Sequence, residues 1–371
     1  MASNGLHVAV IKGDGIGVDV TDAALAVVDA ACLRTGAAAP RYSELHAGAA
    51  YFAETGRDFE PGGEEAAGAA DAMFLGAIGL PSVRHPDGTE ISPHLRLRDR
   101  YQLYAGVRPV KAYPNAPQRL ADPRAATIDL VILRESTEGL FYSAAVHGRA
   151  KIDGDAAVED TLRITRATTE KLHAFAFKLA AKRRARGKAG RVTCVDKANV
   201  FASMAFFRKI FDEVAARHPE TPTDYAYVDA QALDLIRRPW DADVLVTENM
   251  FGDILSDLAG GLVGGMGMAA CAEIGDDAAL FQPAHGSAPD IMGADKANPL
   301  AAILSAALML DYLGERAGDA ALVDAGRLIE AGVERGFAEN RLRPMEFGGD
   351  MGTLAVTAAL LDLIGAAAQA A

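Results

Sequence analysis

Short apolar runs recur along the chain, and most of them lead through polar residues into a segment with helical periodicity. The first run ends in the glycine-rich GDGIG, and an Ala/Val-rich helical pattern follows over residues 18–32. Strands that alternate with helices in this way are typical of α/β folds. The predicted strands cover residues 6–11, 72–78, 128–133, 192–195, 225–228 and 244–246, and three successive helices are predicted over 300–312, 321–333 and 353–368.

The length and charge of the chain limit its organisation and its partners. A chain of 371 residues that is half apolar can bury a large core, and that length favours two domains over one. The 37 basic and 50 acidic residues give a net charge of -13, which argues against nucleic acid or an anionic membrane as a partner. An anionic substrate would therefore need a local basic pocket.

The cysteines and the N-terminal segment favour a cytoplasmic protein. Cys32, Cys194 and Cys271 are far apart and lack CxxC spacing, so neither a disulfide framework nor a zinc site is expected. The first residues lack a basic segment followed by a long apolar one, and no run of about 18 apolar residues occurs later. We therefore expect neither export nor membrane insertion.

The motif FGDILSD follows an apolar run and contains two acidic residues four positions apart. In the first turn of a helix, Asp253 and Asp257 would project from one face, where two carboxylates repel each other. Because no cation lies nearby in the sequence, a bound divalent metal ion explains the pair better than an interaction with the helix dipole. Asp229, which follows another predicted strand, could complete an oxygen-rich site suited to magnesium or manganese.

Four arginines stand out in a chain whose overall charge is acidic. Arg108 follows the apolar stretch LYAGV and Arg134 ends a predicted strand, so both are expected where strand ends open onto a crevice. Bidentate guanidinium pairing there would orient a dicarboxylate, whereas each arginine taken alone is better explained by a surface salt bridge. The prediction therefore depends on the whole group, Arg96, Arg98, Arg108 and Arg134.

A lysine follows directly on a predicted strand in VDKANV. In a partly desolvated site beside a metal-bound hydroxyl, Lys197 could lose its proton and act as a general base. A solvated lysine is the better explanation from the sequence alone. The basic stretch 182–191 is likewise expected to be a solvated helix end rather than a phosphate-binding patch.

Two glycine-rich segments are candidates for nucleotide contacts. GDGIG is not GxGxxG, and a short glycine turn after a strand is common, so it is only a weak indication of a nucleotide. Residues 285–299 place glycines, prolines and a serine around Asp290 and Asn298, and such a polar loop could wrap an adenosine. An acidic residue there suits a free ribose 2′-hydroxyl and repels a 2′-phosphate.

Taken in order, the motifs GDGIG, LRLRDRYQLYAGVRP, RESTEG, VDKANV, FGDILSD and FQPAHGSAPDI resemble the isocitrate and isopropylmalate dehydrogenase family of β-decarboxylating dehydrogenases. The resemblance spans nearly the whole chain. It implies a homodimer of two-domain α/β subunits, each with a large mixed sheet flanked by helices. One domain would comprise residues 1–104 and 264–371, and the other, inserted domain would comprise residues 105–263 and serve dimerisation.

The resemblance also implies roles for individual residues. Lys197 resembles the general base, and it and Asp229 resemble groups that family members lend across the dimer interface. Asp253 and Asp257 look like metal ligands, and the residues that look like the grip on the malate portion of the substrate are Arg98, Arg108 and Arg134. The expected cofactor contacts are Asn199 on the nicotinamide side, His285 and Asn298 on the adenine side, Gly286, Ser287 and Ala288 in the loop, and Asp290 with Ile291, a pair similar to that of NAD-using members.

Two segments depart from the family pattern. Relatives carry a tyrosine, the acid that protonates the enolate, where this chain has Phe141, with Tyr142 one place later. Adjacent residues on a strand point to opposite faces, so a bulge brings Tyr142 into the site, or a water replaces it, or decarboxylation is impaired. In EISPH, Ser92 matches isocitrate enzymes but His94 replaces an asparagine. These two indicate a polar or anionic substituent, and a surface position for His94 is an equal alternative.

The sequence thus predicts an NAD-dependent, Mg²⁺- or Mn²⁺-dependent enzyme that oxidatively decarboxylates a 3-substituted malate of the isopropylmalate or the isocitrate and homoisocitrate type. A tartrate or D-malate dehydrogenase is the nearest alternative. A catalytically impaired, nucleotide-binding regulatory subunit is a further one, which the presence of Lys197, Asp229, Asp253 and Asp257 disfavours.

Overall fold

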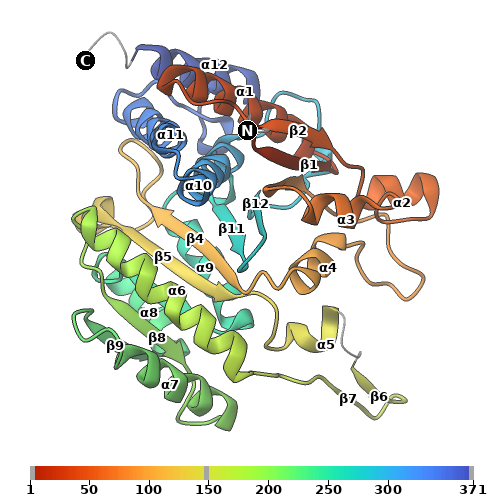
Figure 1. Ribbon diagram of the computed structural model, residues 1–371, viewed down its shortest axis with the longest axis vertical. Helices are drawn as coiled ribbons and strands as arrows, with labels where there is room; N and C mark the ends of the chain where they lie inside the picture. The colour runs from red at the N-terminus through yellow and green to blue at the C-terminus, as the bar shows by residue number, and fades with distance from the viewer. Residues whose placement is uncertain (1–4, 146–149, 367–371) are drawn as a thin grey trace.

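A mixed sheet of ten strands forms the centre of the computed structural model, which describes residues 5–145 and 150–366 (Figure 1). The strand order is β2-β1-β3-β12-β11-β4-β5-β10-β8-β9. Each end of the sheet is parallel, and the antiparallel strands β11 and β4 join the two ends. The strands are β1 (His7–Gly13), β2 (Arg41–Glu44), β3 (Ala72–Ala77), β4 (Ala105–Lys111), β5 (Asp129–Glu135), β8 (Val192–Asp196), β9 (Thr223–Tyr227), β10 (Val244–Thr247), β11 (Ala270–Ile274) and β12 (Ala279–Pro283), with a separate hairpin of β6 (Lys151–Asp153) and β7 (Ala157–Glu159).

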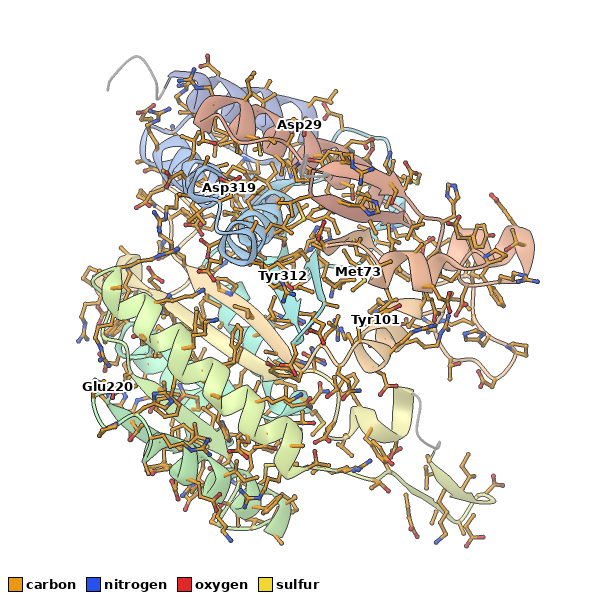
Figure 2. All side chains as sticks on the ribbon, viewed as in Figure 1. Asp29, Met73, Tyr101, Glu220, Tyr312 and Asp319 are labelled. Carbon is orange, nitrogen blue, oxygen red and sulfur yellow. The ribbon has the colours of Figure 1, made fainter. Side chains whose placement is uncertain are left out.

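Helices cover both faces of the sheet. On one face, α1, α10, α11, α12, α6 and α7 pack on one continuous apolar core. On the other face, α3 and α4 cover one apolar core, which includes Met73, and α8 and α9 cover a second (Figure 2). The helices are α1 (Gly17–Thr35), α2 (Ala49–Thr55), α3 (Gly63–Gly68), α4 (Pro93–Arg100), α5 (Phe141–Ala145), α6 (Arg166–Ala185), α7 (Ala202–Ala215), α8 (Val228–Arg237), α9 (Asn249–Leu262), α10 (Leu300–Ala317), α11 (Ala320–Ala338) and α12 (Thr353–Ala366).

Side chains alternate along each strand, so one sheet contributes to the apolar cores on both of its faces. In β1, Val8 and Val10 belong to the continuous core, whereas Ala9 and Ile11 point to the α3–α4 side. The two cores on that second side are separated by charged side chains that come from the middle of the sheet, on β4, β5 and β11. The fold therefore places its buried charges between α4 and α9.

The predicted α/β class is confirmed, and each predicted strand and helix is present within a few residues of its expected bounds. Residues 367 and 368 of the last predicted helix lie outside the described residues. The sequence analysis missed β2, β4, β11 and β12 of the large sheet and both strands of the hairpin. In consequence, its placement of Arg108 at a strand end is wrong, because Arg108 lies in the middle of β4, opposite Ile132 of β5.

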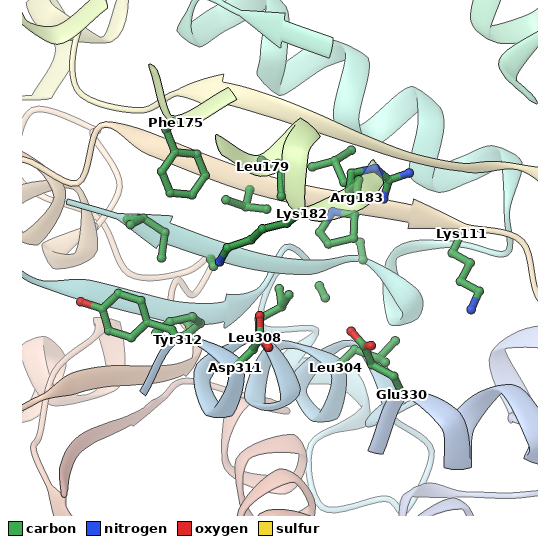
Figure 3. A pocket seen from close by; sticks show the side chains of 18 of the residues that line it. Lys111, Phe175, Leu179, Lys182, Arg183, Leu304, Leu308, Asp311, Tyr312 and Glu330 are labelled. Atoms are coloured by element: carbon green, nitrogen blue, oxygen red, sulfur yellow. The ribbon is translucent and has the colours of Figure 1, made fainter. Parts of the chain in front are cut away.

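A cavity of about 600 Å³ lies on the continuous-core face, between α6 and α10 (Figure 3). Phe175 and Leu179 of α6 and Leu304 and Leu308 of α10 line it. The basic stretch 182–191 begins at the edge of this cavity, where Lys182 pairs with Glu315 and Arg186 pairs with Asp311. The basic residues of α6 are therefore largely neutralised by acidic partners.

Two further features concern cysteines and membranes. Cys32, Cys194 and Cys271 are all free thiols buried in the fold. Among the helices in the described part of the chain, none combines the length and the apolar character needed to cross a bilayer.

Candidate active site

Three buried arginines meet between α4 and α9. Arg98 comes from α4, Arg108 from β4 and Arg134 from β5, and they are 6%, 6% and 3% exposed. Burial, together with the positive charges of Arg98 and Arg108, lowers the pKa of Arg134 to about 10. Mutually repelling guanidinium groups inside a protein favour a bound anion. Three of the four arginines therefore lie together as expected, and their role in binding a substrate stays a prediction.

A buried glutamate that the sequence analysis missed holds two of these arginines. Glu273 of β11 is fully buried; its Oε1 forms an ion pair with Nη2 of Arg98 at 3.0 Å and accepts a hydrogen bond from Nη2 of Arg108 at 3.3 Å. Burial alone would raise the pKa of Glu273, but the fields of the arginines outweigh it and the pKa is lowered. Glu273 is therefore ionised and neutralises part of the cluster.

Residues at the start of α9 fix the orientation of Arg134. Its Nε donates to Asn249 Oδ1 at 2.9 Å, and its Nη1 pairs with Asp253. Asn249 in turn donates from Nδ2 to the backbone oxygen of Glu138 at 2.9 Å. Glu248 begins the helix, because its Oε1 accepts from the backbone N–H of Phe251 at 2.7 Å.

The two aspartates of FGDILSD lie on one side of α9 and face the arginines. The helix begins at Asn249, so the expectation that the pair lies in the first turn is wrong. A cation distant in the sequence lies beside them in the fold, because Arg134 pairs with Asp253. Burial and the neighbouring Asp253 raise the pKa of Asp257, against the opposing fields of Arg108 and Arg134. Two adjacent carboxylates fit a hard divalent cation such as Mg²⁺ or Mn²⁺.

Lys197 and Asp229 form a separate pair. Lys197 lies just after β8, and its Nζ is 2.6 Å from Oδ1 of Asp229, which opens α8. Among the described residues, no three acidic, histidine or cysteine side chains lie close enough together to hold a metal ion. One chain therefore does not bring Asp229 to Asp253 and Asp257, and its expected role as a metal-site residue lent across a dimer interface stays a prediction.

His94 and Ser92 lie at the start of α4, beside the arginines. His94 is half-buried, and its Nδ1 is buried without a hydrogen-bond partner among the described residues. Burial, the field of Arg98 and that of Arg134 lower its pKa to about 3, so the ring is neutral. The alternative of a surface histidine is therefore wrong. Ser92 stands at the N-cap position, and its side chain makes no capping hydrogen bond.

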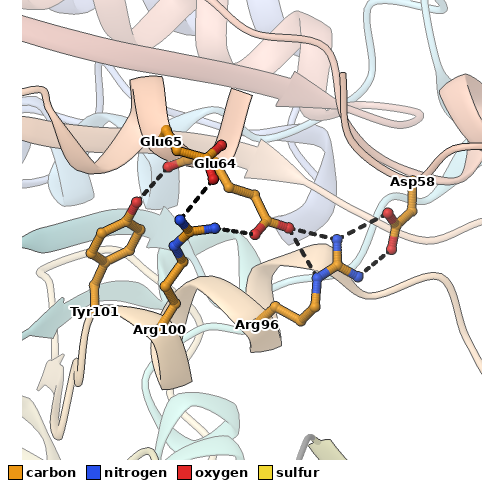
Figure 4. Close-up of polar contacts among 6 residues, drawn as sticks. All are labelled: Asp58, Glu64, Glu65, Arg96, Arg100 and Tyr101. Atoms are coloured by element: carbon orange, nitrogen blue, oxygen red, sulfur yellow. Dashed lines mark hydrogen bonds and ion pairs between the residues drawn. The ribbon is translucent and has the colours of Figure 1, made fainter. Parts of the chain in front are cut away.

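Arg96 does not belong to the cluster. Its guanidinium donates to Asp58 Oδ1 at 2.9 Å and Glu64 Oε1 at 2.6 Å (Figure 4). The neighbouring Arg100 pairs with Glu64 at 3.1 Å and with Glu65 at 2.7 Å. The grouping of Arg96 with the substrate arginines is therefore wrong, and this residue follows the salt-bridge alternative.

Phe141 and Tyr142 lie in the short helix α5, so the expectation that they alternate along a strand is wrong. The Phe141 ring centre is 4.9 Å from Cζ of Arg134, so Phe141 faces the arginine cluster. Tyr142 stacks with Arg163, whose Cζ is 4.8 Å from its ring centre. A catalytic role for Tyr142 stays a prediction.

The loop after β12 is fastened to the GDGIG turn. The backbone N–H of Ile16 donates to the Ser287 oxygen at 2.7 Å, and Ser287 Oγ donates to the Gly79 oxygen. A Cβ at position 15 would lie 2.0 Å from the Ser287 oxygen, so this approach requires glycine. Asp14 accepts three backbone N–H bonds at 2.8 Å, from Ala49, Ala50 and Gly79. The GDGIG turn therefore supports the loop.

The predicted cofactor residues are distributed over this loop and the end of β8. Gly286, Ala288 and Asp290 are exposed, Ile291 is half-buried and Ser287 is buried. Burial lowers the pKa of His285, whose Nε2 has no described partner. Asn298 is buried and donates to Glu346 Oε2 at 2.9 Å, while Asn199 is exposed two residues after Lys197. Their cofactor roles stay predictions.

Comparison with known proteins agrees with this geometry. A sequence model described as isocitrate/isopropylmalate dehydrogenase matches residues 7–364. The 3-isopropylmalate/3-methylmalate dehydrogenase of Methanocaldococcus jannaschii is 40% identical over 347 residues, covering 93% of this chain and 95% of the relative. The homoisocitrate dehydrogenase of the same organism is 37% identical, covering 97% and 98%. The crystal structure of isocitrate dehydrogenase from Methylococcus capsulatus matches with a TM-score of 0.81 and 34% identity, covering 97% of this chain and 99% of that one.

Proposed function

The chain belongs to the isocitrate/isopropylmalate dehydrogenase family, and from this premise we propose that it is an NAD-dependent, divalent-metal-dependent enzyme that oxidatively decarboxylates a 3-substituted malate. The observation that carries the proposal is the cluster of Arg98, Arg108 and Arg134 facing the carboxylates of Asp253 and Asp257. Such a site binds the carboxylates of a hydroxy acid on one side and a cation on the other.

The residues of the site have separate roles in the proposed reaction. The arginines bind the two carboxylates and orient the hydroxyl-bearing carbon. Lys197 accepts the hydroxyl proton as hydride leaves that carbon for NAD, which is reduced, and the alcohol becomes a ketone. The bond to the β-carboxylate then breaks with release of carbon dioxide, and one proton completes the product. A divalent cation held by Asp253 and Asp257 would supply the Lewis acidity that this second step needs.

The proposed cofactor is NAD rather than its phosphorylated form. Asp290 is exposed in the loop after β12, followed by the half-buried Ile291. A carboxylate at this place accepts a hydrogen bond from a free ribose hydroxyl and repels a phosphate on it.

We further propose that the enzyme is a cytoplasmic homodimer in which each copy lends Lys197 and Asp229 to the other's arginines. The Lys197–Asp229 pair lies beside β9, the edge strand of the sheet. Large apolar side chains are exposed around it and on the adjoining helices, a surface that a second copy would bury. These side chains are Val200, Phe201, Tyr225, Tyr227, Leu233, Ile236 and Ile254.

A tartrate or D-malate dehydrogenase is the second candidate. The polar Ser92 and the neutral His94 favour it, because both occupy the segment expected to contact the substituent of the malate. Phe141 in place of the expected tyrosine is a second reason, since it weakens the case for efficient protonation after decarboxylation.

The test of the proposal follows NADH absorbance in the presence of Mg²⁺ or Mn²⁺. The panel contains isopropylmalate, isocitrate, homoisocitrate, D-malate and tartrate, each with NAD and with NADP. We expect turnover with NAD of at least one 3-substituted malate. Turnover of tartrate or D-malate alone would support the second candidate, and silence across the panel would support the regulatory-subunit alternative.

Mixing two inactive variants tests the shared site. Lys197→Ala and Asp253→Asn should each abolish turnover. If the copies share sites, a mixed dimer has one site with both substitutions and one intact site, so subunits unfolded and refolded together should regain about a quarter of wild-type activity. Absence of recovery in mixtures that refold to dimers would reject the shared arrangement.

A further inference from the structure

We propose that Glu273 is a specificity-determining residue, which holds Arg98 and Arg108 so that the arginine cluster accepts substrates with two carboxylates and an uncharged substituent. This inference rests on the proposed function and narrows its substrate class. It discriminates between dicarboxylates, such as the isopropylmalate and methylmalate in the name of one relative, and tricarboxylates, such as the homoisocitrate in the name of another.

Glu273 acts through the arginines rather than on a substrate directly. Its side chain is fully buried behind them, and one of its oxygens forms an ion pair with each of Arg98 and Arg108. One Nη2 group of each guanidinium is thereby directed inward and is withdrawn from substrate. Glu273 therefore fixes the direction of the donors that remain.

The charges in the site leave a positive excess that a dianion would balance. Within one chain, three guanidinium groups face one buried carboxylate, Glu273, so two positive charges are left over. The Lys197–Asp229 ion pair that a second copy would lend adds no net charge. The two charges of a divalent cation would balance Asp253 and Asp257. A dicarboxylate neutralises what remains, whereas a third carboxylate would enter a buried site without a matching cation.

The segment expected to contact the substituent offers no compensating positive charge. The basic side chains that follow this segment on α4, Arg96 and Arg100, are bound to Asp58, Glu64 and Glu65 (Figure 4). His94, which does face the cluster, is kept neutral by burial and by Arg98. Its unpartnered Nδ1 and the free Ser92 hydroxyl provide neutral hydrogen-bonding groups, which suit an uncharged polar or small apolar substituent.

The strand opposite Glu273 makes room for it. Gly106 of β4 pairs with Glu273 across the sheet, and a Cβ at position 106 would lie 2.9 Å from Oε2 of Glu273. A glycine at this place thus permits a long acidic side chain between two strands. The buried carboxylate of Glu273 and the space left by Gly106 are therefore parts of the same packing arrangement.

The experiment compares Glu273→Gln with the wild type on dicarboxylate and tricarboxylate substrates. Initial rates with NAD and Mg²⁺ give kcat/KM for isopropylmalate, D-malate, isocitrate and homoisocitrate, and titration calorimetry with Mg²⁺ but without NAD gives binding. We expect the wild type to prefer dicarboxylates. In Glu273→Gln, the tricarboxylate to dicarboxylate ratio should rise about tenfold or more, mainly through KM, the scale of one added charge interaction in a partly buried site.

Two further variants serve as controls. Glu273→Asp keeps the charge, so it should keep the preference for dicarboxylates even if its rates fall. Glu334→Gln removes an exposed carboxylate that pairs with Lys111, and it should leave every ratio unchanged.

The outcomes separate this inference from the proposed function. A wild type that prefers tricarboxylates overturns the inference and leaves the proposed function standing, and this measurement does not depend on any variant being folded. An equal fall for all four substrates in a folded Glu273→Gln also overturns it, since that is the mark of a purely structural role. A wild type that oxidises none of them instead refutes the proposed function.

Discussion

Replacing Gly106 by alanine tests whether the packing around Glu273 controls the arginine cluster. Gly106 lies in β4 between Glu273 of β11 and Arg134 of β5. An added Cβ would lie 2.6 Å from Ser136 Oγ, 2.9 Å from Glu273 Oε2 and 3.2 Å from the backbone oxygen of Arg134. Since the backbone oxygen is held in the sheet, the two side chains must move.

The expected size of the effect follows from two opposing contributions. Gly106 is not among the residues with positive φ, so alanine fits the backbone and gains about 0.4–1 kcal/mol from a less flexible unfolded chain. Overpacking a buried site costs about 1–3 kcal/mol. The net loss is roughly 1–2 kcal/mol, which corresponds to a fall in Tm of roughly 1–3 °C for a chain of this length. Displacement of Glu273 misplaces Arg98 and Arg108, so kcat/KM should fall roughly 10- to 100-fold.

The assay combines thermal unfolding with NADH kinetics on the substrate that the wild type prefers. The matched control is Gly365→Ala near the end of α12, where an added Cβ has open space and should not lower Tm. The double variant Gly106→Ala/Ser136→Ala removes the nearest contact and leaves the one with Glu273. Full recovery of kcat/KM in the double variant would show that Ser136, not Glu273, carries the effect. A Gly106→Ala protein with raised Tm and unchanged KM would refute the reasoning.

Three further predictions concern single residues. Arg96→Ala should lower stability by about 1 kcal/mol through loss of its ion pairs and leave KM within twofold; a tenfold rise in KM would return Arg96 to the substrate site. Burial lowers the pKa of His173 to about 3, below the unfolded value near 6.5, so the stability that this neutral ring contributes is complete above pH 6.5 and is lost as the pH falls toward 3. Between pH 6.5 and 5, the free energy of unfolding of the wild type, measured with urea, should fall by about 1.4 kcal/mol per pH unit more than that of His173→Gln. Parallel curves of this free energy against pH would contradict the prediction. Phe141→Tyr places a hydroxyl next to Arg134 and should raise the carbon dioxide released per NADH formed; a wild type that already releases one per NADH would show that no proton donor is missing.

The fold could be predicted where the strands consist of long apolar runs. β5 and β10 read as strands because Ile, Leu and Val dominate them. β11 and β12 were not predicted because their sequences, ACAEI and ALFQP, are short and contain small or polar residues with little strand preference. They are held in place by neighbours on both sides, which only the assembled sheet supplies.

The limits of the site prediction have the same origin. Arg96 and Arg98 are two positions apart on α4, so their side chains point in nearly opposite directions around the helix. The sequence shows both as equal candidates, and only the packing of Leu97 under α4 decides which one faces the cluster. The sequence analysis missed Glu273 because the residues around it, ACAEI, are otherwise apolar or small. Its partners Arg98 and Arg108 are also more than 160 residues away in the chain.

The position of Glu273 also relates the arginine cluster to the far side of the sheet. Along β4 and β11, Arg108 and Glu273 point to the cluster, while Val107 and Ala272 point to the cavity between α6 and α10. The same two strands therefore carry the charges of the site on one face and line the cavity on the other. The helices α6 and α10 come from opposite ends of the sheet and are joined by ion pairs across that cavity. Restraint of those strands, by Glu273 on one face and the helix pair on the other, keeps three repelling arginines in one place.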